Sequence, residues 1–172
     1  MATTTLFVGG ARSGKSRLAQ TAMEALPSPW TYLATAEAWD AEMADRITRH
    51  RADRGPGWRT VECPLDLPQA IGAAEGPVLV DCLTLWLTNV MLGGHDVARH
   101  SAELIAAIGA ARHPLMLVSN EVGLGIVPDH PLGRAFRDEA GRLNQAVAAA
   151  VERCWFVVAG MVLPLASFSP EN

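Results

Sequence analysis

The segment Gly9-Gly10-Ala11-Arg12-Ser13-Gly14-Lys15-Ser16 follows the apolar, β-branched run 4–8 and precedes a helical pattern over about 15–26. It fits the spacing G-x-x-x-x-G-K-[ST] of a phosphate loop between a strand and a helix. Glycines let backbone N–H groups approach phosphate oxygens, a lysine adds a compact positive charge, and a serine hydroxyl can ligate Mg²⁺. A glycine-rich turn ahead of a helix is the alternative, but the flanking strand and helix favour a nucleoside triphosphate site.

Composition places the chain among ordinary globular proteins. It has 172 residues, of which 49% are hydrophobic and 19% are charged, and this length suits one domain over residues 1–172. The net charge of -4 provides no basic surface for nucleic acid, so bound phosphates must be held locally. Lys15 is the only lysine in the chain, and every other basic side chain apart from histidine is arginine.

Cysteine spacing and hydropathy indicate the cellular compartment in which the protein is expected. The three cysteines, Cys63, Cys82 and Cys154, have neither metal-ligand nor paired spacing, and we expect buried thiols in a reducing cytosol. The N-terminus lacks the positive start of a signal peptide. The longest apolar run, 154–168, contains a glycine and a proline and is too short to span a bilayer. We therefore expect a cytoplasmic protein without a nucleic-acid partner and without stable membrane insertion.

Short apolar runs alternate with helical patterns along the chain, which predicts an α/β, P-loop NTPase-like three-layer fold with a mostly parallel central sheet. We expect an edge strand at 58–62 and core strands at 4–8, 30–34, 77–81, 115–118 and 154–158, of which 154–158 is the last core strand. Helices are expected at about 15–26, 40–54, 65–74, 97–111 and 132–153, with another beginning near 84. The residues after Pro164 are expected to form a loose tail.

Polar residues follow several of the predicted strands. Residues 35–37 follow the strand 30–34, Asp81 ends the strand 77–81, and the polar, glycine-containing segment 119–128 follows the fourth core strand. Ligands of open α/β sheets bind at the carboxyl ends of the strands, so these residues are expected to border one crevice. Asp81 has the form of a metal-associated Walker B acid, and a cap for the helix near 84 is the alternative.

One histidine stands out from the other four. His50 falls on the same face of the predicted helix 40–54 as Met43, Ile47 and Arg54, and further arginines at 46, 49 and 51 surround it. From the residues alone, His50 is either a functional imidazole or the end of an apolar stripe. We expect His95, His100, His113 and His130 to have ordinary structural roles, because they lie in loops or on helix surfaces.

Five segments in order resemble the bifunctional adenosylcobinamide kinase/adenosylcobinamide-phosphate guanylyltransferase family of cobalamin synthesis. They are the phosphate loop, Arg46-Ile-x-x-His50-x-x-x-Arg54, Trp58-Arg-Thr-x-Glu62, Asn120-Glu-Val-Gly-x-Gly-Ile-Val-Pro128 and Gly141-Arg-x-Asn-Gln145. The resemblance extends from residue 6 to about 160. It implies an enzyme that phosphorylates adenosylcobinamide with ATP or GTP and then transfers GMP from GTP to adenosylcobinamide phosphate. The family's second step passes through a covalent GMP–histidine.

The resemblance also implies roles for individual residues. By motif position, His50 is the nucleophile, and Lys15 is the catalytic lysine that holds the β and γ phosphates. Ser16 and Asp81 are expected to hold Mg²⁺. The expected nucleotide contacts are Gly9, Gly10, Ala11, Arg12, Ser13, Gly14, Lys15, Ser16, Ala34, Thr35, Ala36, Arg51, Ala52, Asp53, Arg54, Glu62 and Asp81. Because the family forms trimers with the active site between subunits, a homotrimer is expected.

Two other functional classes use the same phosphate loop. A regulatory GTP switch reads its base through Asn-Lys-x-Asp, and this motif is excluded because Lys15 is the only lysine. A single-function small-molecule kinase needs no nucleophilic histidine and remains the alternative. GTP labelled at the α-phosphate distinguishes this kinase from the bifunctional enzyme.

Overall fold

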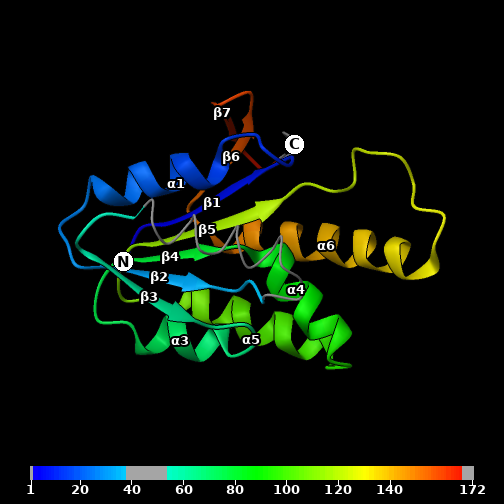
Figure 1. Ribbon diagram of the computed structural model, residues 1–172, viewed down its shortest axis with the longest axis horizontal. Helices are drawn as coiled ribbons and strands as arrows, with labels where there is room; N and C mark the ends of the chain where they lie inside the picture. The colour runs from blue at the N-terminus through cyan, green and yellow to red at the C-terminus, as the bar shows by residue number, and fades with distance from the viewer. Residues whose placement is uncertain (1, 38–53, 168–172) are drawn as a thin grey trace, which may run out of the picture.

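The computed structural model describes residues 2–37 and 54–167 and contains a seven-stranded sheet (Figure 1). The strands are β1 (Thr4–Gly9), β2 (Trp30–Ala34), β3 (Trp58–Glu62), β4 (Val78–Asp81), β5 (Leu115–Asn120), β6 (Arg153–Val158) and β7 (Met161–Leu165). Their order is β3-β2-β4-β5-β1-β6-β7. All neighbouring strands pair in parallel except β6 and β7. The predicted mostly parallel sheet, with 58–62 at its edge, is confirmed.

Helices cover both faces of the sheet (Figure 1). They are α1 (Lys15–Glu24), α3 (Leu67–Ala73), α4 (Leu83–Leu92), α5 (Val97–Gly109) and α6 (Pro131–Ala150). Successive side chains of a strand point to opposite faces, and β1 shows this plainly. Phe7 packs in a core with α1, whereas Leu6 and Val8 pack in a larger core with the other four helices. The three layers of the predicted α/β fold are therefore confirmed. The predicted helix 40–54 lies outside the described residues except for Arg54.

The strand β7 was not expected from the sequence. Ala159 and Gly160 both have positive φ angles, of 51° and 76°, as required by the two-residue turns that join antiparallel strands. This turn carries the chain back along β6, so that Pro164 lies opposite Trp155. β7 extends one residue past Pro164, so the expectation of a loose tail directly after Pro164 is wrong at Leu165. In the part of the chain that is described, no helix is both long and apolar enough to cross a membrane.

Gly9 lies at the end of β1, opposite Val157 of β6. A Cβ atom at this position would lie 2.3 Å from the carbonyl oxygen of Val157. We expect Gly9→Ala to lower the free energy of unfolding by about 1–3 kcal/mol, because the paired backbone must move to admit the methyl group. Urea unfolding would measure the loss. Gly10→Ala is the matched control, since nothing lies within 4 Å of its Cβ position; equal stability of the two variants would contradict this account.

Candidate active site

The phosphate loop lies at the carboxyl end of β1 and leads directly into α1. Gly14 is the N-cap of α1 and has a φ of 98°, a left-handed conformation that suits glycine. Lys15 is only 7% exposed, and its Nζ donates a hydrogen bond to the carbonyl oxygen of Gly10 at 3.1 Å. The ammonium group is therefore folded back over the loop, beside the helix N-terminus, where an anion is favoured.

The turn between β6 and β7 supports this loop. The backbone N–H of Gly160 donates to the carbonyl oxygen of Ser13 at 2.8 Å, and a Cβ on Gly14 would lie 3.2 Å from the Cα of Gly160. A cavity of about 560 Å³ lies here, lined by residues 12–17 together with Ala159 and Gly160. The predicted phosphate site therefore includes a C-terminal turn that the sequence analysis did not assign to it.

Asp81 is held from two sides at the end of β4. Its Oδ1 lies 3.4 Å from the Oγ of Ser16 on α1, and its Oδ2 accepts a hydrogen bond of 2.9 Å from the hydroxyl of Tyr32 on β2. Burial, and then the neighbouring Asp81 carboxylate, raise the pKa of Tyr32 far above its usual value, so the phenol stays protonated as the donor. The N-cap of α4 is Cys82, without a side-chain cap, so Asp81 faces the phosphate loop instead of capping this helix.

The oxygen atoms at and beside Asp81 are suitable ligands for a magnesium ion. Ser16 and Asp81 offer a hydroxyl and a carboxylate oxygen, and Mg²⁺ binds such hard oxygens through few protein ligands, with phosphates and waters completing its shell. Within the described residues, the buried Oγ of Ser13 has no hydrogen-bond partner. The site therefore offers the Ser13 hydroxyl as a further polar atom, in addition to the oxygens of Ser16 and Asp81.

Arg54 brings a second cation to the same region. Its guanidinium carbon lies 3.8 Å from the centroid of the Tyr32 ring, within range of a cation–π contact. Arg54, Tyr32 and Asp81 line a cavity of about 350 Å³ together with the α1 residues Ser16, Arg17, Gln20, Thr21 and Glu24. Since Ser16 and Arg17 also line the cavity at the phosphate loop, the two cavities adjoin.

The structure gives Thr35 an internal role. Thr35 is fully buried, and its hydroxyl both accepts a hydrogen bond from the Cys82 N–H at 2.8 Å and donates one to the Cys82 carbonyl oxygen at 2.7 Å. Asn89 donates to the Thr35 carbonyl oxygen at 2.8 Å. These bonds fasten the backbone that follows Asp81. The half-buried Ala34 and Ala36 and the exposed Glu62 lie at the same carboxyl edge of the sheet.

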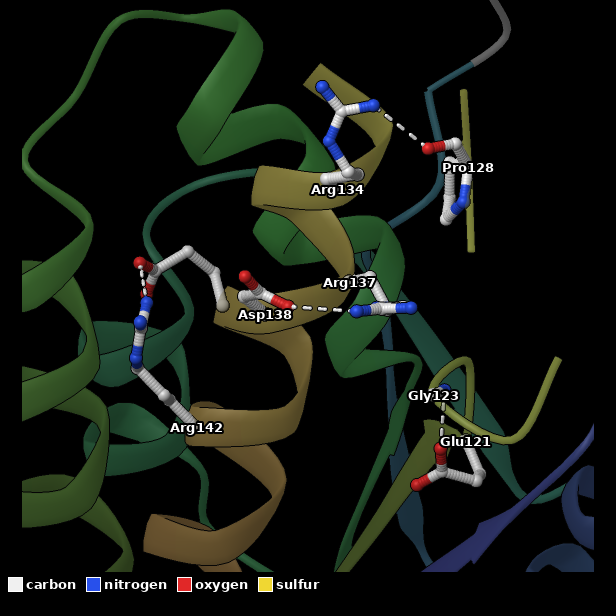
Figure 2. A network of polar contacts seen from close by, with 8 residues as sticks. Glu121, Gly123, Pro128, Arg134, Arg137, Asp138 and Arg142 are labelled. Carbon is white, nitrogen blue, oxygen red and sulfur yellow. Dashed lines mark hydrogen bonds and ion pairs between the residues drawn. The ribbon is translucent and has the colours of Figure 1, made fainter. Parts of the chain in front are cut away.

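The segment after β5 starts beside the phosphate loop, where the backbone N–H of Glu121 donates to the Gly9 carbonyl oxygen at 2.9 Å. Figure 2 shows the Glu121 carboxylate turned toward the Gly123 N–H, which donates a hydrogen bond to it. It also shows Arg134, whose guanidinium donates to the Pro128 carbonyl oxygen at 3.0 Å. Between these two anchors, Ile126 is 96% exposed. The segment therefore adjoins the crevice at its first residues, as predicted, and then extends into solvent.

Residues 5–165 match the family model described as "Cobinamide kinase / cobinamide phosphate guanyltransferase". The chain belongs to this family.

The match covers nearly the whole chain, and curated relatives agree with it. The chain is 48% identical over 166 residues to a "Bifunctional adenosylcobalamin biosynthesis protein CobP" of Pseudomonas aeruginosa, covering 93% of this chain and 95% of the relative. It is 41% identical over 174 residues to a "Bifunctional adenosylcobalamin biosynthesis protein CobU" of Salmonella typhimurium, covering 91% and 96%. The family resemblance that the five segments indicated is thus confirmed.

Solved structures add support for the fold alone. A protein of Pyrococcus horikoshii OT3 superimposes with a TM-score of 0.54 at 10% identity, covering 98% of this chain and 88% of that one.

The site residues implied by the cobinamide kinase family divide into two groups. Lys15, Ser16, Asp81 and Arg54 converge around the adjoining cavities. The predicted nucleophile His50 lies outside the described residues, as do its neighbours Arg46, Arg49, Arg51, Ala52 and Asp53, so their roles stay predictions. From the sequence, Tyr32 was expected only to be part of the strand 30–34. The available signal for a role in the site was its position on one face of β2, since successive side chains of a strand point to opposite faces.

Proposed function

We propose that this chain phosphorylates adenosylcobinamide with ATP or GTP, transfers GMP from GTP to the product, and does so as one domain over residues 1–172. The convergence of Lys15, Ser16, Asp81 and Arg54 beside the phosphate loop carries this proposal, in a chain that matches the cobinamide kinase family over residues 5–165. The names of the curated relatives support two activities on one chain.

The kinase step depends on positioning and on charge. Transfer of a γ-phosphoryl group places negative charge on its oxygens and requires little covalent chemistry from the protein. The Lys15 ammonium and the backbone N–H groups at the start of α1 would stabilise this charge. Bound Mg²⁺, held through Ser16 and Asp81, would neutralise charge on the β and γ oxygens. Arg54 adds a further cation in the adjoining cavity.

The guanylyl step requires a nucleophile, and we assign it to His50. An imidazole nitrogen attacks the α-phosphorus of GTP, an N–P bond forms, and the P–O bond to pyrophosphate breaks so that pyrophosphate leaves. A phosphate oxygen of adenosylcobinamide phosphate then attacks the same phosphorus, which releases the histidine and yields adenosylcobinamide-GDP. The arginines around His50 in the sequence would stabilise the charge that develops on the phosphoryl oxygens.

Labelled GTP tests the proposal against the alternative of a single-function kinase. The purified chain is incubated with α-labelled GTP without acceptor, and separately with adenosylcobinamide and γ-labelled GTP. We expect protein-bound label in the first reaction and labelled adenosylcobinamide phosphate in the second. Phosphorylated product without any α-label on the protein, and without adenosylcobinamide-GDP, would identify the single-function kinase instead.

The family resemblance supports an assembly as well. We propose a cytoplasmic homotrimer whose active sites lie between subunits and which has no nucleic-acid partner. Light scattering of the purified chain measures the subunit number directly.

A further inference from the structure

Tyr32 contacts two charged groups that face the cavity beside the phosphate loop. Its hydroxyl donates to Oδ2 of Asp81 at 2.9 Å, and the face of its ring lies 3.8 Å from the guanidinium carbon of Arg54. The other oxygen of the same carboxylate lies 3.4 Å from Ser16. One aromatic side chain thus adjoins both the anionic and the cationic lining of the cavity.

The β-sheet register explains this contact. β2 and β4 are parallel neighbours in which Tyr32 lies opposite Leu79, two residues before Asp81. Residues two apart on a strand share a face, so Asp81 projects on the same side of the sheet as the phenol. Because the Tyr32 hydroxyl lies at the end of a rigid ring, it reaches the carboxylate from a fixed direction.

Neighbouring aromatic residues hold the Tyr32 ring in place. Trp58 meets it edge-on, with 6.1 Å between ring centroids, and the Trp58 indole N–H donates to Glu24 on α1 at 2.9 Å. Trp30 packs on Trp58 at 5.3 Å. Tyr32 itself is 6% exposed. Packing alone would be served equally well by phenylalanine, so it does not account for the hydroxyl directed at Asp81.

We propose that Tyr32 is a positioning residue of the phosphoryl-transfer site: its hydroxyl orients the Asp81 carboxylate toward Ser16 for metal binding, and its ring face holds the Arg54 guanidinium over the adjoining cavity. This inference rests on the proposed function, because it takes Ser16 and Asp81 as the magnesium ligands. The Tyr32 hydroxyl occupies Oδ2, which leaves Oδ1 on the Ser16 side. Tyr32 touches neither the metal nor the reacting phosphate in this account.

Tyr32→Phe isolates the role of the hydroxyl. We expect the Mg²⁺ concentration for half-maximal phosphorylation to rise about tenfold, the effect of losing one hydrogen bond to a charged group, while the KM for GTP at saturating Mg²⁺ stays unchanged. The same shift should appear without turnover, as about tenfold weaker Mn²⁺ binding to the protein–GTP complex measured by electron paramagnetic resonance. Trp30→Phe is the matched control, because it removes one hydrogen bond, to the Leu26 carbonyl oxygen, from the same aromatic cluster but outside the cavity.

Tyr32→Leu and Arg54→Gln test the role of the ring face. In EDTA, where metal binding is removed, we expect Tyr32→Phe to bind GTP like the wild type, whereas Arg54→Gln and Tyr32→Leu should each bind it several-fold more weakly. Adding Arg54→Gln to Tyr32→Leu should weaken GTP binding less than adding it to Tyr32→Phe. Since the Phe variant keeps the ring, it reports on the hydroxyl even if the Leu variant does not fold.

The outcomes separate this inference from the proposed function. Wild-type Mg²⁺ and Mn²⁺ dependence in a folded Tyr32→Phe protein would overturn the role of the hydroxyl, and lowered stability with unchanged metal binding would do the same. Equal GTP binding in EDTA by Tyr32→Leu and the wild type would overturn the role of the ring. A wild-type chain that neither binds GTP nor phosphorylates adenosylcobinamide would instead overturn the proposed function, on which the inference rests.

Discussion

Lys15→Ala should reduce phosphorylation of adenosylcobinamide by at least about 10²–10³-fold, the cost of removing one preorganised charge-stabilising donor from an active site. Lys15 is nearly buried at the start of α1, and no second lysine exists in the chain to replace it. The measurement is kcat for γ-phosphoryl transfer to adenosylcobinamide at saturating nucleotide.

A matched control removes one exposed cation elsewhere. Arg99→Ala deletes a surface guanidinium that forms an ion pair with Glu103 one turn along the same helix, and we expect its turnover to match the wild type. Lysine-directed reagents offer a second check, because nucleotide should protect the single lysine side chain from them. Near-normal turnover in a folded Lys15→Ala protein would remove the phosphate-loop assignment.

His50→Ala should abolish guanylylation while phosphorylation of adenosylcobinamide is retained at least in part. A route through a covalent intermediate cannot proceed without its nucleophile, whereas γ-phosphoryl transfer needs positioning and charge stabilisation and no histidine adduct. The measurement is protein-bound label from α-labelled GTP. An N–P adduct should survive alkali and be released by acid.

His95→Ala is the corresponding control, because His95 is an exposed histidine beside the C-terminus of α4. We expect it to acquire label at the wild-type level. If the His50→Ala protein still acquires acid-labile label, another residue is the nucleophile and the assignment of His50 is wrong.

Local patterns in the sequence predicted most of the sheet and the phosphate loop. The runs around Leu6 and Leu33 are apolar on both faces, as buried parallel strands require, and the glycine spacing of residues 9–16 specifies a loop between a strand and a helix. Asp81 could be placed near Ser16 because both follow strands at the carboxyl edge of a parallel sheet. These inferences needed only neighbours in the sequence and one general rule of α/β topology.

The remaining parts of the site depend on contacts between distant segments. Tyr32 meets Asp81 because β2 and β4 are neighbours in the sheet, and no local pattern in either strand specifies that order. The Thr35 hydroxyl forms hydrogen bonds with the Cys82 backbone for the same reason. A residue that was expected to contact the nucleotide therefore also holds β2 and the end of β4 together. The turn at Gly160 did have a local signal in its alanine–glycine pair between apolar runs, but its contact with the phosphate loop follows only from the pairing of β1 with β6.

Double labelling of one product tests most directly the claim that one chain performs both reactions. The purified chain is given adenosylcobinamide, Mg²⁺ and a mixture of α-labelled and γ-labelled GTP that carry different isotopes, and the corrinoid products are separated. The account predicts adenosylcobinamide-GDP that carries one γ-derived phosphorus next to the corrinoid and one α-derived phosphorus next to guanosine. A product that carries only the γ-derived phosphorus, with no α-derived label on corrinoid or protein, would contradict it.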